Sequence, residues 1–325
     1  MNHKTLKFAI LFSAMAVIIS CTKKTESTDI KQAEELPKVF FTNDISPEGL
    51  MAAFEALNVT PTGNVAVKIH SGEPGNQNFL HPEFMRELVQ KVNGTFIETN
   101  VAYSSRRGHT ASHLIVAEEH GWTAVAPFVV LDGDGEISFP VVNGKHLTEN
   151  LVGNRFDEFD FHIVISHFKG HGLGGFGGAL KNVAIGYASA SGKALIHTHG
   201  RDRTNAWIEG TDQTSFLEAM AEAAKTITDR TKGKIIYINV MNKMSIDCDC
   251  DANAPAPTMG DIGILVSLDP VALDQACVDL VFAAHDGHDL IERIKTMNGL
   301  RTIEYAEELG IGIRKYELIN LDEGK

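Results

Sequence analysis

Short apolar runs of strand character alternate with longer helical segments along most of this chain, and this alternation constrains the fold more than any other feature. Strands are expected at residues 38–41, 64–70, 95–98, 128–131, 137–142, 161–166, 234–240, 262–267 and 316–320. Helices are expected to begin near residues 46, 81 and 179, and to cover 110–120, 214–231, 271–284, 290–297 and 301–309. The pattern predicts a three-layer α/β fold, a mostly parallel sheet with helices on both faces. Residues 38–325 would form a single domain, with room for a small extra lobe near 200–230.

The first twenty residues have the features of a signal peptide. Lys4 and Lys7 precede an apolar run at 8–19, which is too short for a lasting membrane span. The run ends in Ile18-Ile19-Ser20-Cys21, which resembles the lipobox of bacterial lipoproteins, so we expect lipidation at Cys21. An uncleaved membrane anchor is the alternative. Residues 21–37 are polar and are expected to form a flexible tether. The residue after Cys21 is Thr22 and not aspartate. By resemblance to lipoproteins of many Gram-negative bacteria, this favours the outer membrane, so we expect the protein on its periplasmic side.

The charge balance limits the partners of the chain. There are 29 Lys and Arg residues against 42 Asp and Glu residues, a net charge of −13. Removal of Lys4 and Lys7 with the signal peptide leaves −15. Such a surface repels nucleic acid, so no nucleic-acid partner is expected. A small anion would have to bind inside a local positive pocket.

The densest cluster of chemically active residues follows the strand expected at 161–166. Six glycines lie between Gly170 and Gly178, just before a helix start at about Ala179. Consecutive amides in that position would form an anion-binding nest, and the glycines expected to contribute are Gly172, Gly174, Gly175, Gly177 and Gly178. The loop contains a formal GxGxxG pattern, but no acidic residue follows at dinucleotide-binding distance, which disfavours nicotinamide or flavin. A flexible surface loop is the plain alternative.

A second cluster contains two cysteines. Cys248 and Cys250 follow the strand expected at 234–240. Residues i and i+2 of an extended chain point the same way, so both sulfurs could face one metal, with Asp247 as an oxygen ligand. A disulfide between the two sulfurs is the alternative in an oxidising compartment, and an ordinary loop is another.

Two further segments carry histidine or lysine. His197 and His199 would share one face if residues 194–200 were extended, and would then be candidate metal ligands or ordinary loop histidines. Lys68 and His70 interrupt an apolar strand near its end, where a buried lysine needs a partner or a function.

These segments all follow predicted strands, so they are expected to meet at the carboxyl edge of the sheet. His167 and His171 would then lie near Cys248 and Cys250 and hold a zinc or iron ion. The residues expected to bind substrate or carry catalysis are Lys68, His70, Lys169 and Lys181.

Several motifs together resemble one family. They are Val67–His70 with Gly72–Asn76, Ser166–His171, Gly175–Asn182, Cys248–Cys250, Asp261–Gly263, Ser267–Ala272 and Glu307–Gly312. They are similar to the bacterial and archaeal domain of unknown function 362 family, often found in iron–sulfur proteins. The resemblance implies the fold and the site location, but no reaction. Many members carry a ferredoxin-like cysteine array before the Cys-Asp-Cys motif. Residues 200–244 contain no cysteine here, so no ferredoxin-type cluster is expected.

Three functional hypotheses remain at this point. The first is a metal-dependent redox or hydrolytic enzyme of the cell envelope that acts on a small anion. The second is a non-catalytic lipoprotein that captures a small anion or a metal for a partner. The third is a thiol–disulfide protein that uses Cys248 and Cys250, although the segment lacks a CxxC motif at a helix start.

Overall fold

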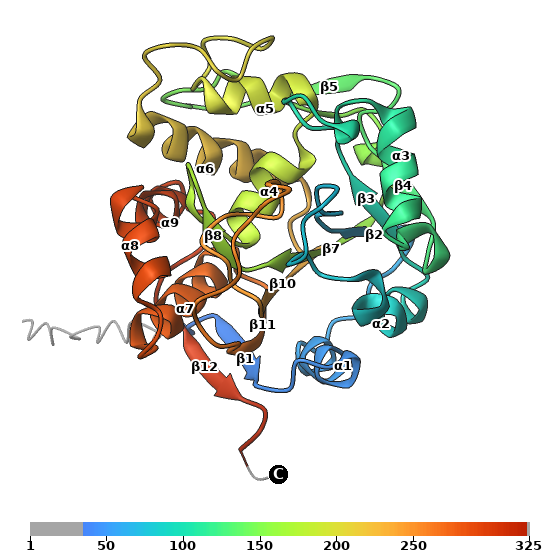
Figure 1. Cartoon of the computed structure of the whole chain (residues 1–325), viewed down its shortest axis with the longest axis vertical. Helices are drawn as coiled ribbons and strands as arrows, with labels where there is room; N and C mark the ends of the chain where they lie inside the picture. Colours follow the sequence, from blue (N-terminus) through green and yellow to red (C-terminus); the bar gives the residue numbers. More distant parts are fainter. Residues whose placement is uncertain (1–34, 324–325) are drawn as a thin grey trace, which may run out of the picture. The chain divides into compact units, whose positions relative to one another are not determined.

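An eight-stranded sheet crosses the part of the chain that the computed structural model describes, residues 35–323 (Figure 1). The predicted signal peptide, Cys21 and most of the predicted tether lie outside these residues. The strands, in spatial order, are β12 (Glu317–Asn320), β1 (Lys38–Thr42), β11 (Gly263–Ser267), β10 (Ile235–Met241), β7 (Phe161–His167), β2 (Val65–Lys68), β3 (Thr95–Glu98) and β4 (Phe128–Val130). Only β11 runs against its neighbours in this sheet, so the prediction of a mostly parallel sheet is confirmed.

Helices cover both faces of the sheet. One side carries α1 (Pro47–Ala56), α2 (Arg86–Lys91) and α3 (Thr110–Glu119); the other carries α4 (Ala179–Tyr187), α5 (Ala190–His197), α6 (Gln213–Arg230), α7 (Pro270–Ala283), α8 (His288–Thr296) and α9 (Leu300–Glu308) (Figure 1). Side chains alternate between the two faces of a strand. In β7, Ile163 and Ile165 accordingly join the apolar cluster of the α1 side, and Val164 joins the other. The three-layer prediction is therefore confirmed.

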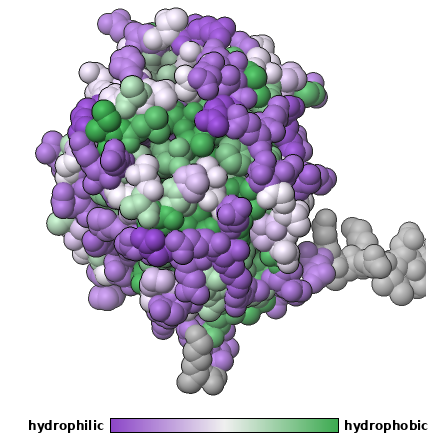
Figure 2. Space-filling model, turned by 90° about the vertical axis from the view of Figure 1, so that its right-hand side faces the viewer, coloured by the Kyte–Doolittle hydropathy of each residue, from purple (hydrophilic) through white to green (hydrophobic). Residues whose placement is uncertain are grey.

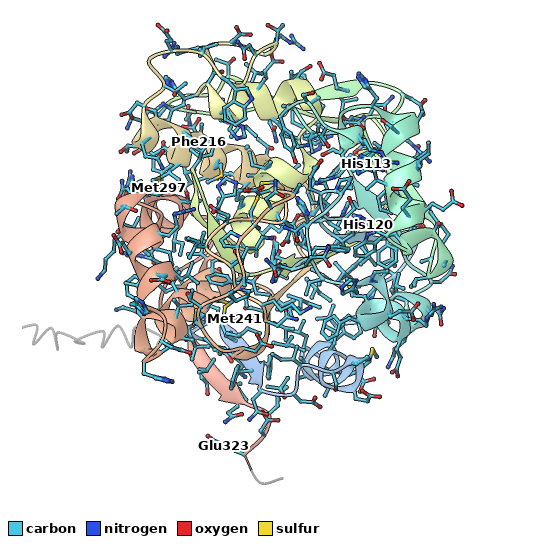
Figure 3. The ribbon with its side chains drawn as sticks, viewed as in Figure 1. His113, His120, Phe216, Met241, Met297 and Glu323 are labelled. Atoms are coloured by element: carbon cyan, nitrogen blue, oxygen red, sulfur yellow. A yellow bond between two sulfur atoms is a disulfide. The ribbon has the colours of Figure 1, made fainter. Side chains whose placement is uncertain are left out.

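Side chains fill the space on both sides of the sheet. Figure 3 shows His113 of α3 and Phe216 of α6 on opposite sides of the interior. On the face in Figure 2, hydrophilic residues dominate the periphery and hydrophobic residues gather near the centre. No helix within residues 35–323 combines the length and the apolar character that a membrane crossing requires.

Local sequence explains several helix starts. Ser46 accepts a hydrogen bond from Gly49 N at 3.0 Å, and Pro47 occupies the first turn of α1. Asp269 accepts hydrogen bonds from Val271 N and Ala272 N, and so caps α7. Ser46 and Asp269 are therefore the N-caps of α1 and α7.

Two local predictions are wrong. Residues 194–200 are not extended, because α5 begins after Ser189, whose hydroxyl accepts from Gly192 N, and continues to His197. Residues 200–230 are not a separate lobe, because the second half is α6, which buries Phe216 and Leu217 in the main apolar cluster. The strands expected at residues 128–131 and 137–142 are present and belong to different sheets: β4 joins the main sheet, and β5 (Glu136–Pro140) pairs with β6 (Glu149–Gly153).

Short elements complete the description. The glycine-rich segment forms a hairpin of β8 (Lys169–His171) and β9 (Gly175–Gly177). The 3₁₀ helices are η1 (Pro82–Met85), η2 (Arg106–Gly108), η3 (Trp122–Ala124) and η4 (Phe156–Glu158).

Candidate functional site

A cavity of about 310 Å³ opens where four neighbouring parallel strands end. In β10, β7, β2 and β3 the chain runs the same way, so their carboxyl ends lie at one edge of the sheet. Lys68 ends β2, Glu98 ends β3, and His167 ends β7; all three line the cavity. Cys250, in the loop after β10, also lines it.

Basic side chains dominate the wall of this cavity. Lys68, Lys169, Lys181, Lys193 and Arg107 line it, while Glu98 is its lining carboxylate. The chain as a whole has the opposite balance, with 42 acidic and 29 basic residues. The cavity is therefore a local positive pocket in an acidic protein.

Two of these cations have carboxylate partners. Lys169 Nζ lies 2.8 Å from Asp249 Oδ2. Arg107 Nη2 lies 3.0 Å from Glu98 Oε1, and its Nη1 lies 3.3 Å from Glu73 Oε2. Each of these two charges is balanced within the protein.

The other three lysines have no carboxylate partner within residues 35–323. Lys68 Nζ donates to the Ile69 carbonyl at 2.5 Å. Lys193 Nζ donates to Thr99 Oγ1 at 2.5 Å and to the Ala188 carbonyl at 2.7 Å. The Lys181 side chain lines the cavity and makes no hydrogen bond or ion pair with another residue in the described part of the chain. Three lysine side chains therefore face the cavity without a carboxylate of the described residues in direct contact.

Burial lowers the pKa values of these three lysines. Burial, aided by neighbouring cations, lowers the pKa of Lys68 to about 7, against the opposing effect of Glu98. Burial and Lys169 lower the pKa of Lys181 to about 7. Burial lowers the pKa of Lys193 to about 8. Holding these ammonium groups charged costs free energy that a bound anion would offset.

His167 is not available as the metal ligand that the sequence suggests. Its Nδ1 lies 3.0 Å from both carboxylate oxygens of Asp249, and its Nε2 lies 2.6 Å from the Asn242 carbonyl. Both neighbours are hydrogen-bond acceptors, so both ring nitrogens already face protein partners. His167 therefore holds the Asp249 loop against the end of β7. Burial alone would raise the pKa of Asp249, but His167 and Lys169 hold it well below its ordinary value.

His171 is a neutral donor. Its Nδ1 accepts hydrogen bonds from Leu173 N at 3.1 Å and Gly174 N at 2.8 Å, so the ring proton sits on Nε2. Burial, together with Lys181, holds the pKa of His171 well below its ordinary value. A metal on Nε2 would have to displace that proton while Nδ1 still faced two amide donors.

Cys248 and Cys250 form a disulfide beside His171. One ligand atom of each of these three residues lies within 4.8 Å of the others, which is close enough for a shared metal. A metal needs thiolates, so this cluster could hold one only after the disulfide is reduced. Cys250 lines the cavity, and Cys248 lies behind it with 5% exposure.

The glycine segment does not form the predicted anion nest. At the start of α4, Ala179 N and Leu180 N donate to the carboxylate of Asp274 at 2.7 and 2.9 Å, so the protein supplies its own anion there. The amide of Gly174 bonds His171, and that of Gly170 bonds the Ser245 carbonyl. Of the glycines named for the nest, Gly177 and Gly178 line the cavity, while Gly172, Gly174 and Gly175 do not.

The remaining predicted residues divide between the cavity and the surface. His70 lines the cavity, and its Nδ1 accepts from Gly72 N at 3.2 Å. His197 also lines it from the end of α5, with Nδ1 donating to the Lys193 carbonyl at 2.8 Å and Nε2 left as an acceptor. His199 and Asp247 are not ligands: His199 accepts from Asp212 N, and Asp247 pairs with Arg293 at 2.5 Å.

Sequence reasoning missed four residues of this site. Glu98 ends a buried strand just as Lys68 does, so the same argument could have identified it. Arg107 and Tyr103 come from a loop whose Ser-Arg-Arg pattern shows no special signal. Lys193 lies on α5, a helix that was read as partly extended.

A comparison with protein-family models identifies the family. A family model described as "Domain of unknown function (DUF362)" matches residues 65–279, which confirms the resemblance found in the motifs. No curated protein matches the chain.

Two solved structures share a loose likeness of fold. The lactate racemase apoprotein from Thermoanaerobacterium thermosaccharolyticum is 13% identical with a TM-score of 0.43, over 74% of this chain and 56% of that one. A protein from Thermotoga maritima is 12% identical with a TM-score of 0.37, over 81% of this chain and 58% of that one. This chain thus matches little more than half the length of each, and the likeness is too loose to transfer a function.

Proposed function

This chain belongs to the DUF362 family, and we propose that the cavity at the strand ends binds a small organic anion. The observation that carries the proposal is the set of three lysines, Lys68, Lys181 and Lys193, that line the cavity without a carboxylate partner within residues 35–323. An opposite charge about 4 Å from a cation contributes about 4 kcal/mol at an effective dielectric constant of about 20. A bound carboxylate would therefore offset much of the cost of burying these ammonium groups.

The walls of the cavity favour an organic ligand over an inorganic one. Val101, Leu173, Ile185 and Trp207 supply apolar surface among the lysines. A volume of about 310 Å³ is at the small end of ligand pockets, which hold roughly 300–1,000 Å³. A short carboxylate with a hydrocarbon part suits both the charge and the apolar lining.

We place this binding activity in the cell envelope. The support is the lipobox-like sequence ending in Cys21 and the polar tether after it. The negative net charge of the chain would repel large polyanions, and a buried cavity admits only a small one.

A zinc or iron ion at His171, Cys248 and Cys250 is a second candidate for the same site. It is favoured by the placement of three ligand atoms within 4.8 Å. It needs reduced cysteines and loss of the amide hydrogen bonds to His171. Metal analysis of protein purified under reducing conditions tests this candidate. One equivalent of metal in the wild type that is absent from Cys248→Ser supports the metal site. Wild-type protein without metal contradicts it.

The anion proposal is tested by calorimetry with matched ligand pairs. Short monocarboxylates and dicarboxylates are each compared with the corresponding neutral amide, propionate with propionamide being the simplest pair. The acids should bind and the amides should not, and Lys181→Met should weaken acid binding at least about tenfold, the equivalent of roughly 1.4 kcal/mol. Lys232→Met is the control, because Lys232 is exposed and lies before β10, at the opposite edge of the sheet. If no acid binds more tightly than its amide, the proposal is wrong.

A further inference from the structure

We propose that Cys248 and Cys250 form a redox-active pair that exchanges with small thiols, and that the cavity selects thiols carrying a negative charge. The inference rests on the proposed anion-binding function, because the same lysines would hold the charged end of the thiol. The inference assigns a reaction to the Cys248–Cys250 disulfide, for which the anion-binding proposal gives no role.

The two cysteines differ in their access to the cavity. Cys250 is partly exposed and lines the cavity, whereas Cys248 is buried behind it. An incoming thiol can therefore reach the Cys250 sulfur first, and Cys248 is placed as the leaving group.

The backbone between the cysteines is anchored from three directions. The Asp249 carboxylate binds His167 and Lys169, and the Asp249 carbonyl accepts from Glu73 N at 2.8 Å. These contacts do not involve the sulfurs, so they persist when the disulfide opens. The two thiols would stay close enough to re-form the bond.

The surroundings favour a thiolate as the leaving group. The Cys250 amide donates to Cys248 Sγ at 3.2 Å, and a neutral His171 ring lies within 4.8 Å of both sulfurs. Cationic surroundings stabilise thiolates and make disulfides easier to reduce. The lysines that line the cavity supply such surroundings.

A purely structural role explains this disulfide poorly. The stabilisation that a disulfide gives through the unfolded chain increases with the length of the loop it closes. Here a single residue separates the two cysteines. The loop is also already held by the contacts of Asp249, so the bond adds little to the fold.

The reaction is ordinary thiol–disulfide exchange. A thiolate RS⁻ attacks Cys250 Sγ, a new S–S bond forms, and the old one breaks with its electron pair leaving on Cys248. A second RS⁻ attacks the sulfur of the bound thiol, releases RSSR and leaves Cys250 as a thiolate. Two protons, taken up from the solvent, complete the products. Two small thiols are thus oxidised by two electrons, and the protein disulfide is reduced to two thiols.

The test is a single-turnover reduction of the oxidised protein by thiols of different charge. The probes are 3-mercaptopropionate, 2-mercaptoethanol and cysteamine, with rates normalised to thiolate concentration. The anionic thiol should react faster than the cationic one by roughly tenfold or more, as expected for electrostatic attraction into a charged pocket. Lys181→Met should reduce that ratio, and Lys232→Met should keep it. Buried Cys277 should stay unlabelled in the folded protein and serves as an internal control.

Single-cysteine variants test the order of attack. In Cys248→Ser, Cys250 should form a stable mixed disulfide with 3,3′-dithiodipropionate, while Cys248 in Cys250→Ser should react far more slowly. Equal rates for the three thiols, or faster labelling of Cys248 than of Cys250, would overturn the inference. Calorimetry with propionate separates the two proposals. If propionate binds but thiol exchange shows no charge selectivity, only the redox role is wrong. If propionate does not bind and exchange shows no charge selectivity, the anion site is wrong as well.

Discussion

At the scale of single residues, the lysines of the cavity couple ligand binding to pH. The unfolded chain keeps a lysine protonated up to about pH 10, whereas folding lowers the pKa of Lys181 to about 7. Between these values the unfolded state binds more protons, so stability rises with pH from about 7 to about 10; below pH 7 the full cost of burying this charge opposes folding. A bound carboxylate requires the ammonium form and therefore favours the lower pH.

We therefore expect propionate to bind more tightly at pH 6.5 than at pH 8.5. Lys68, with a pKa of about 7, should contribute in the same direction. Calorimetry across this range should give a clear slope for the wild type, a flatter one for Lys181→Met, and the wild-type slope for Lys232→Met. Affinity that rose with pH would contradict the charge state assigned to the lysines.

The glycine segment gives a second prediction at this scale. A Cβ at Gly170 would run into the Ile246 carbonyl, whereas the nearest atom to a Cβ at Gly172 is 4.0 Å away. Gly170→Ala should therefore cost about 1–3 kcal/mol of stability through overpacking. Gly172→Ala should change stability by no more than about 0.5 kcal/mol. Urea denaturation of the two variants measures both, and a larger loss for Gly172→Ala would restore a special role for its backbone.

These glycines show why residue types were easier to predict than residue roles. The sequence marks where backbones approach closely, but it does not say whether the approaching group is a ligand or another part of the protein. At Gly170 it is the loop before Cys248, and at Gly178 it is Asp274. Likewise, the acceptors around His167 come from residues about eighty positions away, which spacing along the chain cannot reveal.

At the scale of elements, the sequence predicts the edge of the sheet at which the site forms. It does not predict all of the residues that line the cavity. Lys68, His167 and Cys250 follow strands whose parallel order the alternation predicts, and all three line one cavity. Lys193 was not predicted as a site residue because α5 is short and begins in an Ala-Ser-Gly run of weak helical character. Its start depends on the cap at Ser189 and on packing against β6, which is tertiary information.

The contact between α4 and α7 yields a prediction at this scale. Asp274 of α7 accepts from Ala179 N, Leu180 N and Asn239 Nδ2 at 2.7–2.9 Å, and it is fully buried. Asp274→Ala leaves these donors unpaired and should cost about 3 kcal/mol or more, since hydrogen bonds to charged groups contribute about 1.5–3 kcal/mol each. The partly exposed cap variant Ser46→Ala should cost about 1 kcal/mol. Equal losses in denaturant titrations would show that α4 does not depend on the buried carboxylate.

At the scale of the whole molecule, the distribution of charged residues determines which anions could bind, more than the net charge does. An acidic chain encloses a cavity with five basic lining residues and one acidic one. The exterior would exclude polyanions, and the interior would retain a small anion that has entered. The same arrangement explains the proposed preference of the disulfide for anionic thiols, because charge selection acts before the sulfurs react.

The last prediction concerns where the molecule resides. The lipobox-like sequence predicts that Cys21 carries the lipid. Cys21→Ala should therefore abolish fatty-acid labelling and shift the protein out of the membrane fraction. Cys277→Ser is the matched control: Cys277 is a buried residue of α7, and this change should leave both labelling and fractionation unaltered. Unchanged labelling of Cys21→Ala would refute lipidation, and membrane association that persists without labelling would instead indicate an uncleaved signal segment.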